Sequence, residues 1–212
     1  MSLKFKHPMT CMVAGPTGCG KTMFVRKLLK HKHDMFDPPP QRIIWCYGVY
    51  QSGYADIMKE NPNIEFVEGL PHNFETTINP KVHNLVVVDD LMDECGHDSK
   101  MSNLFTRGSH HRNLSVIFIV QNMYFKGKES RNISLNTQYL VFFKSPRDKS
   151  QITHLGRQLY PGNSKFVQEA YNDATLKPYG YLLVDLKPDT PEEYRLRTCV
   201  FPDELTIVYV KK

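Results

Sequence analysis

One segment constrains the fold of this chain more than any other: the glycine-rich run from Gly15 to Thr22, which reads GPTGCGKT. An apolar run at 10–14 precedes it, and a stretch at 21–31 with apolar residues at helical spacing follows it. A G-x-x-x-x-G-K-[ST] pattern between a strand and a helix predicts a phosphate-binding loop, because the glycines let successive backbone N–H groups converge on phosphate oxygens. The amino terminus of the helix adds the positive end of its dipole.

The pattern also suggests roles for individual residues. The candidate nucleotide-binding residues are Gly15, Pro16, Thr17, Gly18, Cys19, Gly20, Lys21 and Thr22. We expect Lys21 to neutralise the β- and γ-phosphates, and so to be catalytic as well, and the hydroxyl of Thr22 to bind Mg²⁺. Cys19 occupies a variable position of the pattern, so we expect a structural role for it rather than a catalytic thiol.

An acidic pair follows another apolar run. Residues 85–88 are Leu-Val-Val-Val, and Asp89 and Asp90 come directly after them. A carboxylate at the end of a buried strand can hold Mg²⁺ opposite the phosphates, so Asp89 is the candidate metal ligand. A hydrolase also needs a base, and Asp90 is placed to polarise the attacking water. The alternative is a solvated turn.

Polar residues around a third apolar run, at 116–120, complete the candidate catalytic set. Gln121 follows this run, where its amide could contact the γ-phosphate or orient the water; it could equally be an ordinary residue at the end of a strand. Arg107 and Arg112 precede the run. Either could act as an arginine finger on the nucleotide of a neighbouring subunit, because a planar guanidinium suits developing phosphoryl charge; each alone is more often a surface arginine.

Apolar runs of strand length alternate with helical stretches along the chain. Expected strands cover 10–14, 43–47, 64–67, 85–88, 116–120 and 140–143, and expected helices cover 21–31, 99–110 and 149–159. This alternation predicts an α/β fold with a mostly parallel central sheet flanked by helices. The runs at 181–184, 195–200 and 205–210 predict an antiparallel extension at the carboxyl-terminal end.

The length of 212 residues suits one α/β domain. We expect a single domain over 1–212, with a core at about 8–160 and a β-rich extension at about 176–212. Five cysteines without a C-x-x-C pair favour a reducing compartment. The apolar runs fall far short of the roughly 20 residues of a membrane helix, and the first residues lack the apolar stretch of a signal peptide. Neither a membrane partner nor export is therefore expected.

Charge is distributed unevenly along the chain. The formal net charge is only +5, yet residues 55–99 carry 2 basic and 10 acidic side chains, while residues 101–168 carry 10 basic and 2 acidic ones. The basic segment is a candidate surface for a polyanion, although a solvated face explains many such runs.

The motifs together resemble a known family. GPTGCGKT at 15–22, LVVVDD at 85–90 and TRGSHHRNLSVIFIVQN at 106–122 are similar to the viral genome-packaging ATPases of the FtsK/HerA superfamily. Within it, the chain resembles the poxvirus-like branch carried by polintons, adintoviruses and related DNA viruses, over about residues 8–160. One departure is Asp90, which stands where many members have Glu. Of the roles carried over, the resemblance therefore supports that of Asp90 as base the least.

The resemblance implies an additional-strand P-loop ATPase core of the RecA-like type, with ATP and Mg²⁺ as cofactors. It also implies assembly into a ring and ATP-driven translocation of double-stranded DNA into a preformed capsid. The expected partners are double-stranded DNA, further copies of the chain, and a capsid or portal-vertex protein. The expected location is intracellular in the infected host, in the nucleus or a viral factory and transiently at the capsid, without secretion.

DNA is expected to contact the ATPase core or a partner, because no separate DNA-binding domain is visible in the sequence. The segment at 123–131 is basic and aromatic, which suits a loop that lines a pore and contacts phosphates without reading bases. Lys126, Lys128 and Arg131 are the candidate DNA-binding residues, and a plain surface loop is the alternative.

Two other functions fit a phosphate loop in a chain of this length. One is a small-molecule P-loop kinase, against which the acidic pair and Gln121 argue. The other is an assembly protein whose oligomerisation is controlled by nucleotide binding, with incidental turnover. A GTPase is disfavoured, because the sequence contains no N-K-x-D or T-K-x-D signature.

Overall fold

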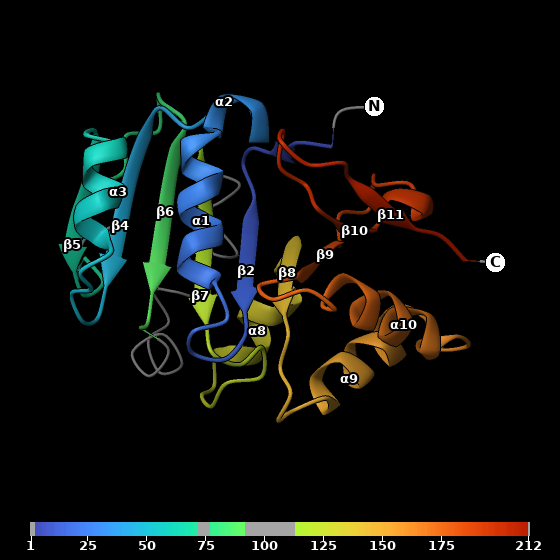
Figure 1. The fold of residues 1–212 in the computed structure, drawn as a ribbon. Coiled ribbons are helices and arrows are strands. Elements are labelled where there is room, and N and C mark those ends of the chain that lie inside the picture. Colours follow the sequence, from blue (N-terminus) through green and yellow to red (C-terminus); the bar gives the residue numbers. More distant parts are fainter. Residues whose placement is uncertain (1–2, 72–76, 92–112, 212) are drawn as a thin grey trace.

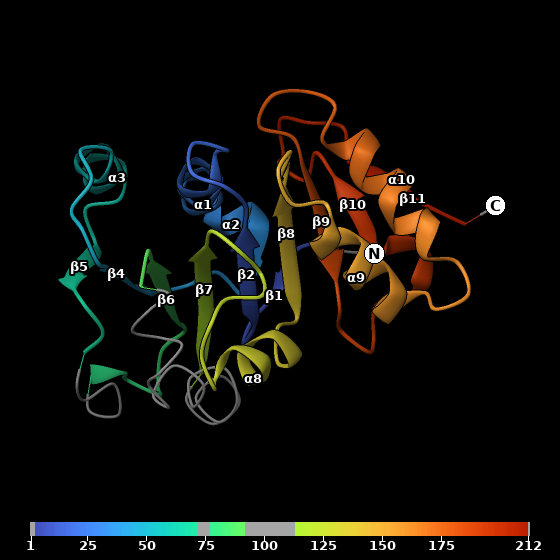
Figure 2. The same cartoon turned by 90° about the horizontal axis from the view of Figure 1, so that it is seen from below.

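A nine-stranded sheet forms the centre of the protein, with helices on both of its faces (Figures 1 and 2). The computed structural model describes residues 3–71, 77–91 and 113–211. The strand order is β11-β10-β9-β8-β2-β7-β6-β4-β5. A second, two-stranded sheet pairs β1 (Phe5–Lys6) with β3 (Phe36–Asp37).

The six strands at the centre and one side of the sheet run parallel. They are β2 (Thr10–Ala14), β4 (Arg42–Tyr47), β5 (Ile64–Glu68), β6 (Asn84–Asp89), β7 (Leu114–Val120) and β8 (Tyr139–Phe143). Every residue of β2, β6, β7 and β8 is buried. Continuous apolar runs are typical of parallel strands covered on both faces, which is why the sequence located these strands correctly.

The carboxyl-terminal strands extend the sheet in the antiparallel sense. They are β9 (Tyr181–Asp185), β10 (Leu196–Thr198) and β11 (Ile207–Tyr209). β9 pairs with β8, β10 with β9, and β11 with β10, each antiparallel. The predicted antiparallel extension is confirmed.

Two apolar clusters cover the two faces of the sheet. One contains the buried sides of α1 (Lys21–Lys30), α2 (Lys32–Met35) and α3 (Tyr54–Glu60). The other contains those of α8 (Ser130–Leu135), α9 (Ser150–Leu159) and α10 (Ser164–Ala174). Residues alternate along β2, so that Met12 packs in the second cluster and Val13 in the first. A 3₁₀ turn, η2 (Glu192–Tyr194), lies between β9 and β10.

Among the described residues, the sequence analysis found α1 and α9 and missed four helices, of which α2 has only four residues. Helices α3 and α8 have only seven and six residues, too few for a clear helical period. Helix α10 could have been predicted, because Val167, Ala170, Tyr171 and Ala174 are buried at helical spacing. The expected helix at 99–110 lies outside the described residues.

Strand order brings three chain segments to one edge of the sheet. β7 lies between β2 and β6, and all three run in the same direction. Ala14 pairs in register with Val120, and Asp89 with Ile119, so these strands end side by side. Their carboxyl ends point downward in Figure 1, and a ligand site is expected where parallel strands end.

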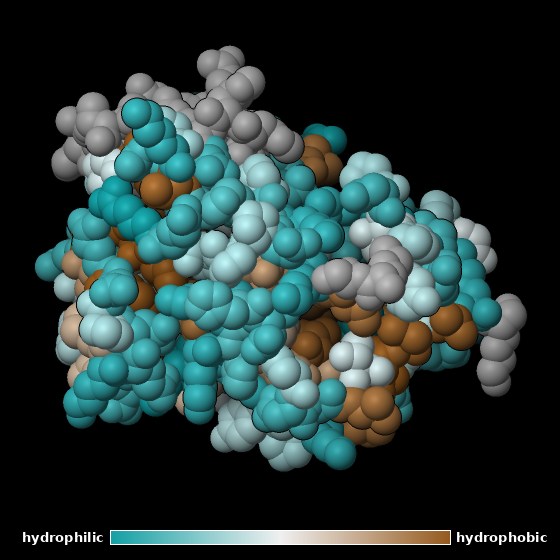
Figure 3. Space-filling view, turned by 90° about the horizontal axis from the view of Figure 1, so that it is seen from above, coloured by the Kyte–Doolittle hydropathy of each residue, from teal (hydrophilic) through white to brown (hydrophobic). Residues whose placement is uncertain are grey.

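The surface seen from the opposite edge is largely hydrophilic, with apolar side chains concentrated in the half that carries the carboxyl-terminal strands (Figure 3). Leu205, Ile207 and Val210 are among the exposed apolar residues of that end of the chain. Within the described ranges, no helix combines the length and apolar character that crossing a membrane requires.

Candidate active site

The glycine-rich segment forms a tight loop between β2 and α1. Gly20, which immediately precedes α1, has a φ of 107°, a left-handed conformation that residues with a side chain rarely adopt. At Gly15, a Cβ atom would lie 2.7 Å from Cys19 Sγ and equally close to Phe143 Cβ. These two positions therefore require glycine, one for its backbone conformation and one for space.

Lys21 is the first residue of α1 and turns its side chain back over the loop. Its Nζ donates hydrogen bonds to the carbonyl oxygens of Gly15 and Pro16, at 2.6 and 2.9 Å. The ammonium group therefore lies inside the curve of the loop. This position suits a cation that neutralises phosphate oxygens held by the loop N–H groups.

Asp89 lies at the end of β6 and is 3 % exposed. Tyr54, a fully buried residue of α3, donates a hydrogen bond from its hydroxyl to Asp89 Oδ2 at 2.9 Å. Burial raises the pKa of Asp89 to about 6, with Asp90 adding to the rise, while the bond from Tyr54, the charge of Lys21 and a hydrogen bond with Thr22 act in the opposite direction. The carboxylate is thus a desolvated charge that a cation would stabilise.

Asp90 follows directly and is exposed. Its φ is 58°, a left-handed conformation that Asp tolerates better than most residues. Gln121 Nε2, at the end of β7, lies 3.5 Å from Asp90 Oδ1. The amide and the carboxylate therefore face each other across the ends of adjacent strands, as expected of groups that orient one water molecule.

A small cleft joins these residues. It has a volume of about 130 Å³. Its lining comprises Thr17, Gly18, Lys21, Thr22, Gln51, Asp89, Asp90, Ile119, Val120 and Gln121. The loop and the polar strand ends thus form one site with a cation on one side and two carboxylates on the other.

The donor set fits magnesium bound together with a nucleotide. Thr22 and Asp89 line the same cleft, so a hydroxyl and a carboxylate are both available beside the loop. Among the described residues there is no group of three or more His, Cys, Asp or Glu side chains that could hold a metal ion by itself. Mg²⁺ is commonly bound in this way, by one or two protein oxygens with the remaining ligands from phosphates and water.

The structure brings together most of the residues that the sequence singled out for catalysis. Lys21, Thr22, Asp89, Asp90 and Gln121 line the same cleft. The two candidate arginine fingers, at 107 and 112, lie outside the described residues.

The candidate DNA-binding residues lie apart from the cleft. Lys126, Lys128 and Arg131 are exposed in the loop after β7 and the first turn of α8. Buried Met123 and Phe125 anchor this loop, and the backbone N–H of Met123 donates to Gln151 Oε1 at 3.0 Å. Of the two aromatic residues, Phe125 is thus structural, whereas Tyr124 and the basic side chains are exposed to solvent.

Sequence reasoning missed one side chain that lines the cleft and one that contacts a cleft residue from behind it. Tyr54 contacts Asp89 from a different element, and Gln51 reaches the cleft from the loop before α3. The segment containing them carries no motif, so only the packing of α3 against the sheet reveals their position.

Fold and site together define a P-loop nucleoside triphosphatase fold of the additional-strand type, because β7 is inserted between the strand before the phosphate loop and the strand that ends in Asp89. No known family profile matches the chain, and no curated protein is detectably similar in sequence. Solved structures of the same fold are nevertheless found.

One such structure is B204, the DNA-packaging ATPase of Sulfolobus turreted icosahedral virus. It aligns with a TM-score of 0.59 and 11 % identity, over 98 % of this chain and 100 % of that chain. The genome packaging NTPase B204 of Sulfolobus turreted icosahedral virus 2, in complex with ATP-γS, aligns with a TM-score of 0.54 and 14 % identity, over 90 % of this chain and 96 % of that one. ATPases 2 and 3 of EssC from Geobacillus thermodenitrificans align with a TM-score of 0.52 and 13 % identity, over 95 % of this chain but 39 % of that one.

These alignments establish the fold, which agrees with the one that the resemblance to packaging ATPases implied. The poxvirus-like branch remains a prediction.

Proposed function

We propose that this protein hydrolyses ATP and uses the energy to move double-stranded DNA into a viral capsid, as a ring of identical subunits. The observation that carries the proposal is the convergence of Lys21, Asp90 and Gln121 at one edge of the sheet, beside a complete phosphate loop. It is supported by the alignment with B204 over nearly the full length of both chains.

In the proposed reaction, the loop N–H groups and Lys21 bind the triphosphate, and Thr22 and Asp89 hold Mg²⁺. When bound there, the ion would supply positive charge that offsets the negative charge developing on the phosphates. Asp90 accepts the proton of the attacking water, and Gln121, facing it at 3.5 Å, orients that water. A side chain at the end of β7 that contacts the γ-phosphate could also pass the state of the nucleotide to the loop that follows it.

The base is tested by replacing Asp90 with Asn. Because Asp90 is exposed and its left-handed backbone conformation suits Asn as well, the variant should fold and bind ATP normally. Turnover should fall at least a hundredfold, which is typical of losing a general base. Full turnover in this variant would disprove the role of Asp90.

The motor function is tested by measuring ATP hydrolysis with and without long duplex DNA. A DNA motor should be stimulated by the duplex. A kinase should instead need a small acceptor, and a nucleotide-gated assembly protein should change its oligomeric state with ATP while ignoring DNA. Either of these results would reject the proposed function in favour of the corresponding alternative.

The proposed DNA contacts are Lys126, Lys128 and Arg131. Replacing both Lys126 and Lys128 with Ala should weaken duplex binding at all sequences. It should also reduce the slope of log K against the logarithm of the salt concentration by about two. Lys81→Ala is the matched control, since Lys81 is also exposed but precedes β6 at the opposite edge of the sheet. Equal effects of the control and the double variant would argue against a local DNA contact.

Ring assembly and a finger acting between subunits are part of the same proposal. Arg107→Ala and Arg112→Ala should each be mixed with wild-type protein and assayed for ATP hydrolysis. If the residue acts on a neighbour's nucleotide, activity should fall faster than the mutant fraction rises. A fall in strict proportion would argue against subunit sharing for that arginine.

A further inference from the structure

A second and larger hollow adjoins the phosphate loop. Its volume is about 920 Å³, and it shares Gly18, Lys21, Thr22 and Gln51 with the smaller cleft. From the loop it extends along α1, and its lining includes Tyr179 and Phe201, neither of which lines the cleft. The two hollows therefore meet at the loop and open in different directions from it.

The orientation of a nucleotide in the loop follows from the cleft. The candidate water-activating residues, Asp90 and Gln121, line the small cleft, so the γ-phosphate must face it. A phosphate loop grips the α- and β-phosphates through its N–H groups. The nucleoside must then leave on the other side of the loop, which is where the larger hollow begins.

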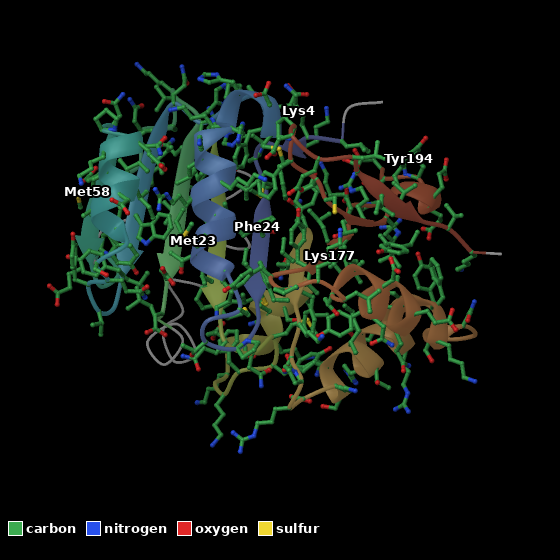
Figure 4. All side chains as sticks on the ribbon, viewed as in Figure 1. Lys4, Met23, Phe24, Met58, Lys177 and Tyr194 are labelled. Atoms are coloured by element: carbon green, nitrogen blue, oxygen red, sulfur yellow. The ribbon has the colours of Figure 1, made fainter. Side chains whose placement is uncertain are left out.

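Tyr179 stands at the entrance to that side. It belongs to the loop between α10 and β9, which reaches across the lower part of β8 toward the start of α1; Lys177 of this loop is labelled in Figure 4. A Cβ atom placed on Gly20 would lie 3.3 Å from Tyr179 Cδ1. The tyrosine is nonetheless 71 % exposed, so its ring lies against the phosphate loop with most of its surface available.

The backbone of this loop is strained at Tyr179, the residue whose ring is exposed. Tyr179 has a φ of 62°, a left-handed conformation that is uncommon for a bulky residue and is usually adopted by glycine or asparagine. The next residue is Gly180, where a Cβ atom would lie 2.4 Å from the carbonyl oxygen of Ala174. Position 180 therefore requires glycine for lack of space, whereas position 179 carries a tyrosine in a backbone conformation that disfavours it. An exposed side chain contributes little packing to offset that strain.

We propose that Tyr179 stacks on the purine base of the nucleotide whose phosphates occupy the loop. The inference rests on the proposed nucleotide binding and adds the side chain that holds the base. Another part of the lining of the hollow is held by its own contacts, because Lys27 lies 4.4 Å from the centre of the Phe201 ring and forms ion pairs with Asp203 and Glu204. Stacking uses the ring face alone, so adenine and guanine nucleotides should both depend on it.

The test compares two ligands on the full chain. A non-hydrolysable ATP analogue has a base, and inorganic tripolyphosphate has none. Tyr179→Gly removes the ring and also relieves the strained φ. It should weaken binding of the analogue by about 5- to 150-fold, the range measured for base stacking on aromatic side chains. Tripolyphosphate binding should stay within twofold of the wild type, and the melting temperature should not fall.

Two further variants serve as controls. Tyr179→Phe keeps the ring face and should bind the analogue as the wild type does. Leu176→Ala removes an equally exposed side chain, also 71 % exposed, from the same connection between α10 and β9, and should have no effect. Unchanged binding of the analogue by Tyr179→Gly would overturn the proposal. So would an equal loss for both ligands, or a comparable loss in Leu176→Ala, since each would indicate a general disturbance of the loop.

Binding is measured without turnover or DNA, so this result is separable from the proposed function. If the chain binds the analogue through Tyr179 but shows no DNA-stimulated hydrolysis, the stacking role of Tyr179 is supported and the proposed motor function is rejected. If hydrolysis is stimulated by DNA but binding of the analogue does not depend on Tyr179, the motor function is supported and the stacking role of Tyr179 is rejected.

Discussion

Replacing Tyr54 with Phe removes a single hydroxyl group that donates to the buried carboxylate of Asp89. Both residues are shielded from solvent, at 0 % and 3 % exposure, and the bond is 2.9 Å long. Hydrogen bonds to charged groups contribute about 1.5–3 kcal/mol, against about 0.5–1.5 kcal/mol for neutral pairs. Since the pKa of Asp89 is about 6, its carboxyl is ionised at pH 8, and Tyr54→Phe should lower the free energy of unfolding by the larger amount.

The assay is urea unfolding of the metal-free and nucleotide-free protein at pH 8. For a chain of this size the loss corresponds to a fall in melting temperature of about 3–12 °C. In the Asp89→Asn background the bond is neutral, so the same substitution should cost only about 0.5–1.5 kcal/mol. Tyr139→Phe is the control, because the Tyr139 hydroxyl is also buried but accepts a neutral bond, from the backbone N–H of Lys6 at 3.2 Å. Its cost should be the same with Asp89 present or replaced.

The sign of the pH dependence gives a second check. Burial raises the pKa of Asp89 above its ordinary value of 3.8, so the folded chain retains this proton when the unfolded chain has lost it. The contribution of Asp89 to stability therefore falls as the pH rises from about 4 to 6. If Tyr54→Phe costs less than 0.5 kcal/mol at pH 8, or costs the same in both backgrounds, the charge-assisted bond is not what holds Asp89 in place.

Three further predictions concern the metal, one histidine and one buried ion pair. Excess EDTA should abolish ATP hydrolysis and leave the melting temperature of the nucleotide-free chain unchanged, because the described residues hold no metal cluster of their own; a fall in that temperature would reveal a structural metal. His7 bonds to Ser115 and Asn113, at 2.6 and 2.9 Å, and burial lowers its pKa below 6.5. The unfolded chain therefore binds this proton first, so stability should decline as the pH falls below about 6.5, and His7→Gln should flatten the decline in urea titrations. Arg197 pairs with Asp185 at 3.0 Å with both side chains buried, so Arg197→Ala should cost about 3–5 kcal/mol in urea unfolding; a loss below 1 kcal/mol would contradict the burial argument.

Burial on both faces explains how much of the fold could be predicted. Strands β2, β6, β7 and β8 are apolar at every or nearly every position, and runs of this kind are visible without knowledge of their neighbours. Helix α3 is the contrary case. Its two buried residues, Tyr54 and Ile57, do not establish a helical period, and its presence depends on packing against the sheet.

The candidate site divides in the same way. The sequence by itself determined the phosphate loop, because Gly15 and Gly20 satisfy local requirements of space and backbone conformation and Lys21 is adjacent along the chain. It also indicated Asp89, Asp90 and Gln121, since polar residues that directly follow apolar runs lie at strand ends. Strand order was not determined by these local patterns.

Only the tertiary structure decided which strand ends meet and what else reaches them. The insertion of β7 between β2 and β6 places Gln121 beside Asp90, although 31 residues separate them in the chain. The contacts of Tyr54 with Asp89 and of Tyr179 with the phosphate loop come from segments without a motif. The physical reason is that such contacts depend on long-range packing, whereas the glycine conformations of the loop depend on its own few residues.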